Sequence, residues 1–265
     1  MVEKLTPNND FLNPEELTRN LKTKIIGKKV YFFKRIPSTN IFAKELIKEC
    51  PVEGTIVIAD VQTSGRGRKN RFWYSPSGGL WFSVILYPNL SPKIGILITM
   101  AVSISIVQAI KDITGLETEI KWPNDLLLNG KKVCGVLTEI DADSDKIKYA
   151  IVGIGINVNN LIDKKLKNTA ISLKEGFGSE VSRIKILKPI LEYLDNNYYK
   201  LINQKFEYIK KAWLSYTKII GRKIQVINEN IIIEGIVQDI DDNGYLILKT
   251  NSGSIKIVNG DIKYL

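Results

Sequence analysis

The sequence predicts an α+β protein made of one large domain and a small β domain at its C-terminal end. In the large domain, short apolar segments follow one another through tight turns and only a few helical segments interrupt them, which favours a largely antiparallel sheet over a doubly wound one. Beyond about Tyr216, short β-branched segments alternate with Asn, Asp and Gly, as is typical of a small barrel. These changes place the domains at 28–215 and 216–265, after a short extension at 1–27.

The elements of the first half are expected from caps and apolar runs. A short helix over about 14–22 lies within the otherwise polar extension. Ser38 and Thr39 are candidate N-caps for a helix that continues to about Glu49, because their side-chain oxygens can accept from the first helical N–H groups. The strands expected here are "KKVYFFKRI" at 28–36, "TIVIAD" at 55–60 and "LWFSVILYP" at 80–88.

The run "IGILITMAVSISIVQAI" at 94–110 is uncharged, and Ser91 and Pro92 supply its cap and first turn. It falls short of the roughly 20 residues that a membrane span needs, and it carries several hydroxyl and amide side chains. We therefore expect a buried core helix and no membrane association.

The second half of the large domain is expected to close the sheet. "EIKWP" at 119–123 indicates a strand, and "DLLLNGKKVCGVLTEI" at 125–140 indicates a hairpin that turns at the Asn-Gly pair. "YAIVGIGINVN" at 149–159 is a further strand, and the pattern becomes helical over 182–213. The strands expected in the small domain are "RKIQVINE", "IIIEGIVQDI", "GYLILKT" and "GSIKIV".

Composition excludes several kinds of chemistry. The chain of 265 residues has no histidine, which removes the usual general base and every Ser-His-Asp or Cys-His arrangement. Its two cysteines exclude a disulfide framework, and the start "MVEKLTPNND" lacks a signal-peptide layout, so we expect a cytoplasmic protein. The net charge of +10 indicates an acidic partner or substrate, and since 216–265 has six basic and six acidic residues, the excess lies upstream.

The loop "TSGRGRKNRFWYSP" at 63–76 is the most informative segment. Gly65 and Gly67 would permit a concave backbone whose N–H groups hold an anion, and the arginines around them present planar, permanently charged forks to phosphate or carboxylate. Trp73 offers a flat face to a base. These features suit a nucleotide with a carboxylated co-substrate, but they also suit RNA stacking, and a solvated surface loop is the plain alternative.

Several segments together resemble the signature blocks of biotin–protein ligases. In chain order they are "STN" at 38–40, "QTSGRGRKNRFW" at 62–73, "KWPND" at 121–125, "GKKVCGVLTE" at 130–139 and "GIGINV" at 153–158. The resemblance implies a catalytic domain similar to class II aminoacyl-tRNA synthetases, followed by an SH3-like domain. One departure is Asn70, where the best-known bacterial members have glycine; because Asn tolerates a left-handed backbone, we expect the loop shape to survive.

The resemblance also implies the reaction. Biotin and ATP form biotinyl-5′-adenylate, and a lysine of a biotin carboxyl carrier protein then takes the biotin. The substrates supply the nucleophiles, which fits a chain without histidine. Bifunctional members carry an N-terminal helix-turn-helix domain, and about 27 residues precede the first expected strand here, so we expect a monofunctional enzyme without specific DNA binding. A homodimer is left open.

Site residues follow from the same resemblance. The implied catalytic residues are Lys132, Arg68 and Asp125. The implied biotin-binding residues are Ser38, Thr39, Asn40, Gln62, Gly65, Arg66, Gly67, Arg68, Lys132, Gly135 and Gly153. The implied ATP-binding residues are Arg66, Arg68, Arg71, Trp73, Asn124, Lys132 and Asn157. Mg²⁺ is expected to arrive with ATP and to be held mainly by phosphates, with Asn124 the one candidate protein ligand.

Two rival functions remain open from the sequence. A lipoate-type ligase would share the fold and the adenylation chemistry, although the pairing of "GRGRKNRFW" with "KWPND" argues against it. A nucleic-acid-binding protein would account for the basic excess and the Arg-Gly loop.

Overall fold

A computed structural model describes residues 12–228 and 231–265. The large domain is built on a seven-stranded sheet in the order β1-β2-β3-β7-β6-β5-β4. The strands are β1 (Val30–Ile36), β2 (Ile56–Gln62), β3 (Leu80–Leu86), β4 (Glu119–Lys121), β5 (Asp125–Leu128), β6 (Lys131–Ala142) and β7 (Ile147–Ile156). Only β1 and β2 pair in parallel among these strands, so the sheet is mixed and largely antiparallel as predicted.

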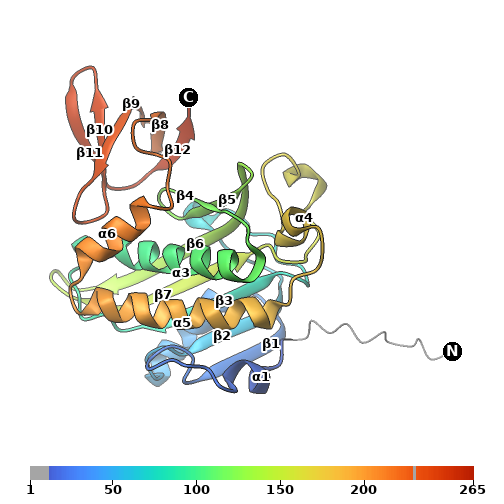
Figure 1. Cartoon of the computed structure of the whole chain (residues 1–265). Coiled ribbons are helices and arrows are strands. Elements are labelled where there is room, and N and C mark those ends of the chain that lie inside the picture. Colours follow the sequence, from blue (N-terminus) through green and yellow to red (C-terminus); the bar gives the residue numbers. More distant parts are fainter. Residues whose placement is uncertain (1–11, 229–230) are drawn as a thin grey trace.

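Helices cover both faces of this sheet. Figure 1 shows α3 and α5 lying side by side across one face, and α2 packs on β2, β3 and β7 from the other. The helices are α1 (Pro14–Thr18), α2 (Thr39–Leu46), α3 (Ile96–Thr114), α4 (Leu173–Phe177), α5 (Arg183–Ile202) and α6 (Phe206–Leu214). Short 3₁₀ turns are η1 (Ile47–Glu49), η2 (Arg68–Asn70), η3 (Pro92–Ile94) and η4 (Lys164–Leu166).

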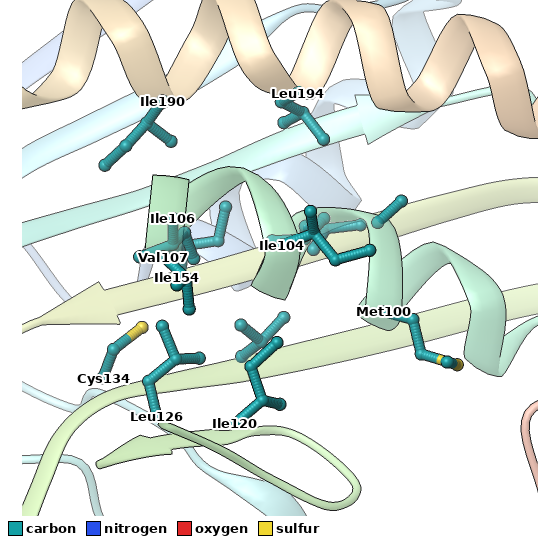
Figure 2. Close-up of a cluster of buried hydrophobic side chains, with 14 of the residues drawn as sticks. Met100, Ile104, Ile106, Val107, Ile120, Leu126, Cys134, Ile154, Ile190 and Leu194 are labelled. Atoms are coloured by element: carbon teal, nitrogen blue, oxygen red, sulfur yellow. The ribbon is translucent and has the colours of Figure 1, made fainter. Parts of the chain in front are cut away.

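Helix α3, which contains most of the uncharged run, lies in the core. The segment Pro92–Thr114 is long and apolar enough to cross a membrane, but 83% of its most apolar 18-residue stretch is buried within the protein. Figure 2 shows side chains of α3 packed between α5 and the sheet: Met100, Ile104, Ile106 and Val107 lie between Ile190 and Leu194 on one side and Ile120, Leu126, Cys134 and Ile154 on the other. Its buried hydroxyls donate to carbonyls one turn earlier, Ser103 to Thr99 and Ser105 to Ala101. The prediction of a buried core helix is confirmed.

The caps of α2 and α3 differ in detail from expectation. Ser38 occupies the N-cap position of α2 with an extended backbone, but its side chain makes no capping hydrogen bond. Pro92 opens η3, where Ser91 Oγ accepts from the Lys93 N–H, and α3 begins two residues after that turn.

The described part of the N-terminal extension packs against the large domain. Helix α1 ends earlier than the predicted 14–22, because Arg19 is extended and Asn20 is left-handed (φ 60°). Further along, the buried carboxylate of Asp195 on α5 accepts from the backbone N–H groups of Lys24, Ile25 and Ile26 at 2.9, 2.7 and 2.8 Å. These bonds fix the approach to β1, since a buried carboxylate needs such donors.

The C-terminal part forms a second sheet, in the order β11-β10-β9-β8-β12. Its strands are β8 (Lys223–Asn228), β9 (Ile231–Ile240), β10 (Leu246–Thr250), β11 (Gly253–Ile257) and β12 (Asp261–Tyr264). Figure 1 shows it beside the β4–β5 end of the large sheet. Trp122 Nε1 donates to Gly244 O at 3.2 Å, and Tyr245 Oη donates to Lys93 O at 2.6 Å, so the two domains are joined through residues outside their strands.

Candidate active site

The Arg-Gly loop leaves β2 at Gln62 and enters β3 at Leu80. Around the arginines, the left-handed residues are Lys69 (φ 54°) and Asn70 (φ 56°), not Gly65 or Gly67. The expected nest of free N–H groups is therefore wrong in this state: Gly67 is extended, and its N–H donates to Arg71 O at 2.7 Å. Gly65 serves close packing instead, because a Cβ there would lie 2.4 Å from Trp73 O.

Asn70 does more than tolerate the turn. Its Oδ1 accepts from Arg66 Nη2 at 2.9 Å, which ties one guanidinium of the loop to the loop's own backbone bend. A glycine at this position could adopt the same φ but could not hold Arg66.

One cavity brings the predicted residues together. Of the sixteen implied by the sequence, all except Gly65 line it: Ser38, Thr39, Asn40, Gln62, Arg66, Gly67, Arg68, Arg71, Trp73, Asn124, Asp125, Lys132, Gly135, Gly153 and Asn157. The wall also includes residues that sequence reasoning did not single out, chiefly the apolar part of segment 160–170 and Asp261 of the small domain.

Lys132 lines the cavity and contacts two other lining residues. It is the second residue of β6, directly after the predicted turn, where Asn129 and Gly130 both have positive φ (52° and 75°). Its Nζ lies 2.6 Å from Asp125 Oδ1 and 5.0 Å from the centroid of the Trp73 ring. The neighbouring Lys131 is absent from the cavity wall, and its Nζ donates to Lys167 O at 2.8 Å.

Arg68 is bound on two sides. Its Nη1 donates to Asn124 Oδ1 at 3.1 Å, and both Nη atoms donate to Gly260 O at 3.2 Å. Burial lowers the pKa of the Arg68 guanidinium, and the nearby carboxylates of Asp261 and Asp125 oppose that shift. A guanidinium remains charged through such a shift, so the cavity retains a fixed cation here.

Asp261 joins the small domain to the Arg-Gly loop. Its carboxylate forms ion pairs with Arg68 at 3.7 Å, with Lys69 at 3.6 Å and, as a short hydrogen bond, with Arg71. Burial raises the pKa of Asp261, but the hydrogen bond from Arg71 and the surrounding positive charges outweigh burial and leave the pKa below its ordinary value. The small domain, although neutral in sum, thus places one carboxylate among the cations of the site.

Trp73 rests on a pair of glycines that face each other across β6 and β7. Gly135 and Gly155 are register partners, and a Cβ on them would lie 3.2 Å and 2.5 Å from atoms of the indole. The glycines therefore open room for Trp73 in this state. The indole Nε1 is buried and has no hydrogen-bond partner within the described chain.

The polar end of the cavity is built from α2 and the end of β2. Gln62 Oε1 lies 2.8 Å from the Thr39 N–H and 3.1 Å from Thr39 Oγ1, and Gln62 Nε2 donates to Ser75 Oγ at 3.0 Å. Elsewhere in the lining, buried Asn157 accepts from Asn160 Nδ2 at 3.1 Å. Amides and hydroxyls with fixed partners supply directional recognition within an otherwise apolar wall.

The described residues contain no group of three or more His, Cys, Asp or Glu side chains that could hold a metal ion. Asn124 is engaged on both of its polar atoms, because Oδ1 accepts from Arg68 and Nδ2 donates to Val136 O at 2.7 Å.

Both cysteines are free, and burial raises the pKa of the Cys134 thiol, which makes it a packing residue. The lining suits a ligand with an anionic centre, an aromatic part and a polar head.

Two family models match the chain. The model described as "Biotin/lipoate A/B protein ligase family" matches residues 32–157, and the model described as "Biotin protein ligase C terminal domain" matches residues 219–262.

Named relatives and solved structures agree with these models. The chain is 38% identical to the bifunctional ligase/repressor BirA of Bacillus subtilis, over 95% of this chain and 79% of that protein. It is 31% identical to the biotin–[acetyl-CoA-carboxylase] ligase of Paracoccus denitrificans, over 83% of this chain and 93% of that protein. Its structure is similar to biotin protein ligase from Aquifex aeolicus in complex with biotin and ATP, with a TM-score of 0.77, 31% identity, and coverage of 90% and 99% of the two chains.

Proposed function

The chain belongs to the biotin–protein ligase family and is a ligase enzyme, and from that premise we propose that it biotinylates a carrier protein in two steps in the cavity around Lys132. In the first step, an oxygen of the biotin carboxylate attacks the α-phosphorus of ATP. The bond to the β-phosphate breaks, and biotinyl-5′-adenylate and pyrophosphate form. In the second step, the amine of a carrier lysine attacks the acyl carbon, loses a proton and releases AMP.

The observation that supports this proposal most strongly is the convergence of cations in one cavity that also holds an indole and fixed amides. Two anions, a carboxylate and a triphosphate, repel each other on approach. Lys132 between them, with Arg66, Arg68 and Arg71 around the phosphates, would reduce that repulsion and stabilise the charge that develops on the α-phosphate oxygens. Positioning of this kind needs no protein nucleophile.

The other lining residues divide between the two substrates. Trp73 supplies a face for adenine and Asn157 an edge contact to it. Ser38, Thr39, Asn40 and Gln62 surround the polar head of biotin, and Gly67, Gly135 and Gly153 leave the space beside it. The Aquifex relative is described as bound to biotin and ATP, which supports this pairing of ligands.

Asp125 acts in the second step. In this state its carboxylate neutralises Lys132 at 2.6 Å. When Lys132 turns toward the ligand anions, Asp125 becomes available to accept a hydrogen bond from the incoming lysine and to orient it for attack.

Mg²⁺ enters as part of MgATP and offsets the charge of the phosphates. The described residues offer it no cluster of carboxylates, and binding through Asn124 Oδ1 would require Arg68 to leave that oxygen. Phosphate oxygens and water would then supply most of its ligands. The carrier is of the biotin carboxyl carrier type, in line with the name of the Paracoccus relative. We further propose that the reaction takes place in the cytoplasm.

Mass spectrometry under native conditions tests the proposal. The protein is incubated with MgATP and biotin, with MgATP and lipoate, or with either substrate alone. We expect a tightly held biotinyl-adenylate and biotin-dependent pyrophosphate release. Adenylation of lipoate in preference to biotin, or pyrophosphate release that does not depend on biotin, would exclude biotin as the substrate.

A further inference from the structure

Behind the polar end of the cavity lies a chain of hydrogen bonds that begins at a carboxylate. Glu139 Oε2 accepts from Asn40 Nδ2 at 2.6 Å. Asn40 Oδ1 lies 2.6 Å from Ser83 Oγ, and Ser83 Oγ lies 2.7 Å from Thr39 Oγ1. Thr39 and Asn40 line the cavity, whereas Ser83 is fully buried and Glu139 lies outside the lining.

Strand register holds Ser83 and Glu139, the two partners of Asn40, on either side of β7. Ser83 on β3 pairs with Gly153 on β7, and a Cβ on Gly153 would lie 2.1 Å from Asn40 Oδ1. The Asn40 amide therefore lies flat against β7 between its two partners. Glu139 reaches it from β6, on the far side of β7 from Ser83.

Proton counting fixes the direction of these bonds. A carboxylate only accepts, so Asn40 must turn its NH₂ toward Glu139 and its oxygen toward Ser83. That oxygen also only accepts, so the single proton of Ser83 goes to Asn40. Ser83 can then take part in the 2.7 Å contact with Thr39 only as an acceptor, and the Thr39 hydroxyl proton points to Ser83.

This direction decides what Thr39 offers to the cavity. With its single proton directed to Ser83, the Thr39 hydroxyl cannot also donate to Gln62 Oε1, 3.1 Å away, so both oxygens present lone pairs there. Two oxygens at that separation with no proton between them attract an N–H donor. If the Ser83 proton instead pointed to Thr39, the Thr39 hydroxyl would be free to donate, and the site would favour an acceptor.

We propose that Glu139 is a positioning residue that sets the direction of the chain Glu139–Asn40–Ser83–Thr39 and so makes Thr39 an acceptor for an N–H of the ureido ring of biotin. The inference rests on the proposed function. It explains why a charged side chain is placed behind a cavity wall that it does not form. The carboxylate selects for a ligand head group rich in N–H donors without touching it.

Calorimetric binding of biotin without ATP tests the proposal, because it requires no catalysis. Glu139→Gln keeps the size of the side chain but can donate as well as accept, so the chain can run in either direction. We expect biotin to bind about tenfold more weakly, the value of one good hydrogen bond, while kcat at saturating biotin changes less than about twofold. Asp141→Asn, two residues along the same strand at an exposed position, is the matched control and should bind as the wild type does.

Ser83→Ala provides the second arm. It breaks the chain between Asn40 and Thr39, so it should weaken biotin by a similar factor, and adding Glu139→Gln should cause no further loss. A full additional loss of affinity in the double variant would overturn the proposal. Unchanged biotin affinity in Ser83→Ala would overturn it as well. If Glu139→Gln fails to fold, the affinity of Ser83→Ala alone decides the matter. Failure of the wild type to bind biotin at all would refute the proposed function itself.

Discussion

Replacing Lys132 with Met removes one charge and little else. Met retains much of the apolar stem that packs near the Trp73 ring, and the position lies next to a surface turn, so folding should survive. If the ammonium bridges the biotin carboxylate and the α-phosphate, its loss removes about 3–4 kcal/mol of transition-state stabilisation, by analogy with one oxyanion-hole donor. That corresponds to a rate reduction of roughly 10² to 10³.

The structure adds a second contribution to this estimate. The partner of Lys132 is Asp125 at 2.6 Å, and both side chains are largely buried, with 32% and 26% of their surface exposed. Lys132→Met therefore leaves an unpaired carboxylate facing two anionic substrates. The double variant Lys132→Met/Asp125→Asn should recover part of the lost rate of adenylate formation, since it removes that repulsion without restoring the cation.

The assay separates the two half-reactions. Pyrophosphate release with biotin and ATP reports adenylate formation, and labelling of a carrier with preformed biotinyl-adenylate reports transfer. Lys132→Met should impair the first much more than the second, because the anhydride already exists in the second. Lys131→Met is the control, since Lys131 binds Lys167 O outside the cavity. Equal pyrophosphate rates in the two variants would refute the role of Lys132.

The loop and the small domain give three further predictions. Arg68→Ala breaks the contacts to Asn124 and Gly260 and should release biotinyl-adenylate faster, seen as labelling of bystander lysines; unchanged retention and turnover would contradict this. Asn70→Gly keeps the left-handed turn but frees Arg66, and equilibrium binding should show ATP weakened by a few fold, whereas wild-type affinity would mean that Asn70 acts only through its backbone. Asp261→Asn should lower the free energy of unfolding by about 1 kcal/mol at pH 7. Because folding lowers the pKa of Asp261, the stabilisation by its carboxylate is fully present at a pH above the unfolded-state pKa of about 3.8 and is lost as the pH falls through the folded-state pKa. The free energies of unfolding of variant and wild type, measured by urea titration, should therefore converge only in acid.

Most of the fold could be predicted because its elements depend on local pattern. The Asn129–Gly130 pair adopts the positive φ angles that a tight hairpin requires, and the alternation on either side gives β5 and β6. Two short elements were missed. Helix α4 has only five residues, although the "SLKE" at its start forms a capping box that could have revealed it. Strand β12, "DIKY", is four residues with two charged side chains, and only pairing with β8 makes it a strand.

The candidate site could be predicted only where short motifs carry it. The role of Asp261 could not be predicted, because Asp261 lies 190 positions from Arg71 in the sequence. A single carboxylate in a segment of zero net charge gives no indication of a distant partner. Ser83 and Glu139 lie within segments that were predicted as strands, yet their contact with one asparagine depends on the register of β3, β7 and β6. The nest expected at Gly65 and Gly67 was wrong for a related reason: the turn is made at Lys69 and Asn70, and Gly67 closes it with an ordinary backbone hydrogen bond.

Most cations of the site are paired with protein carboxylates in this state, and this affects how ligand affinity should be interpreted. Lys132 is paired with Asp125, while Arg68, Lys69 and Arg71 share Asp261. A triphosphate and a carboxylate that enter the site must therefore displace two protein carboxylates from these cations, whereas the Arg66 guanidinium is held, within the described residues, only by the amide of Asn70. The measured affinity for either substrate is the difference between two sets of ion pairs of similar kind, so a variant that removes a carboxylate strengthens substrate binding while one that removes a cation weakens it. The second substrate binds to cations that the first has already released from their protein partners. The affinity for each substrate should therefore be higher when the other is already bound.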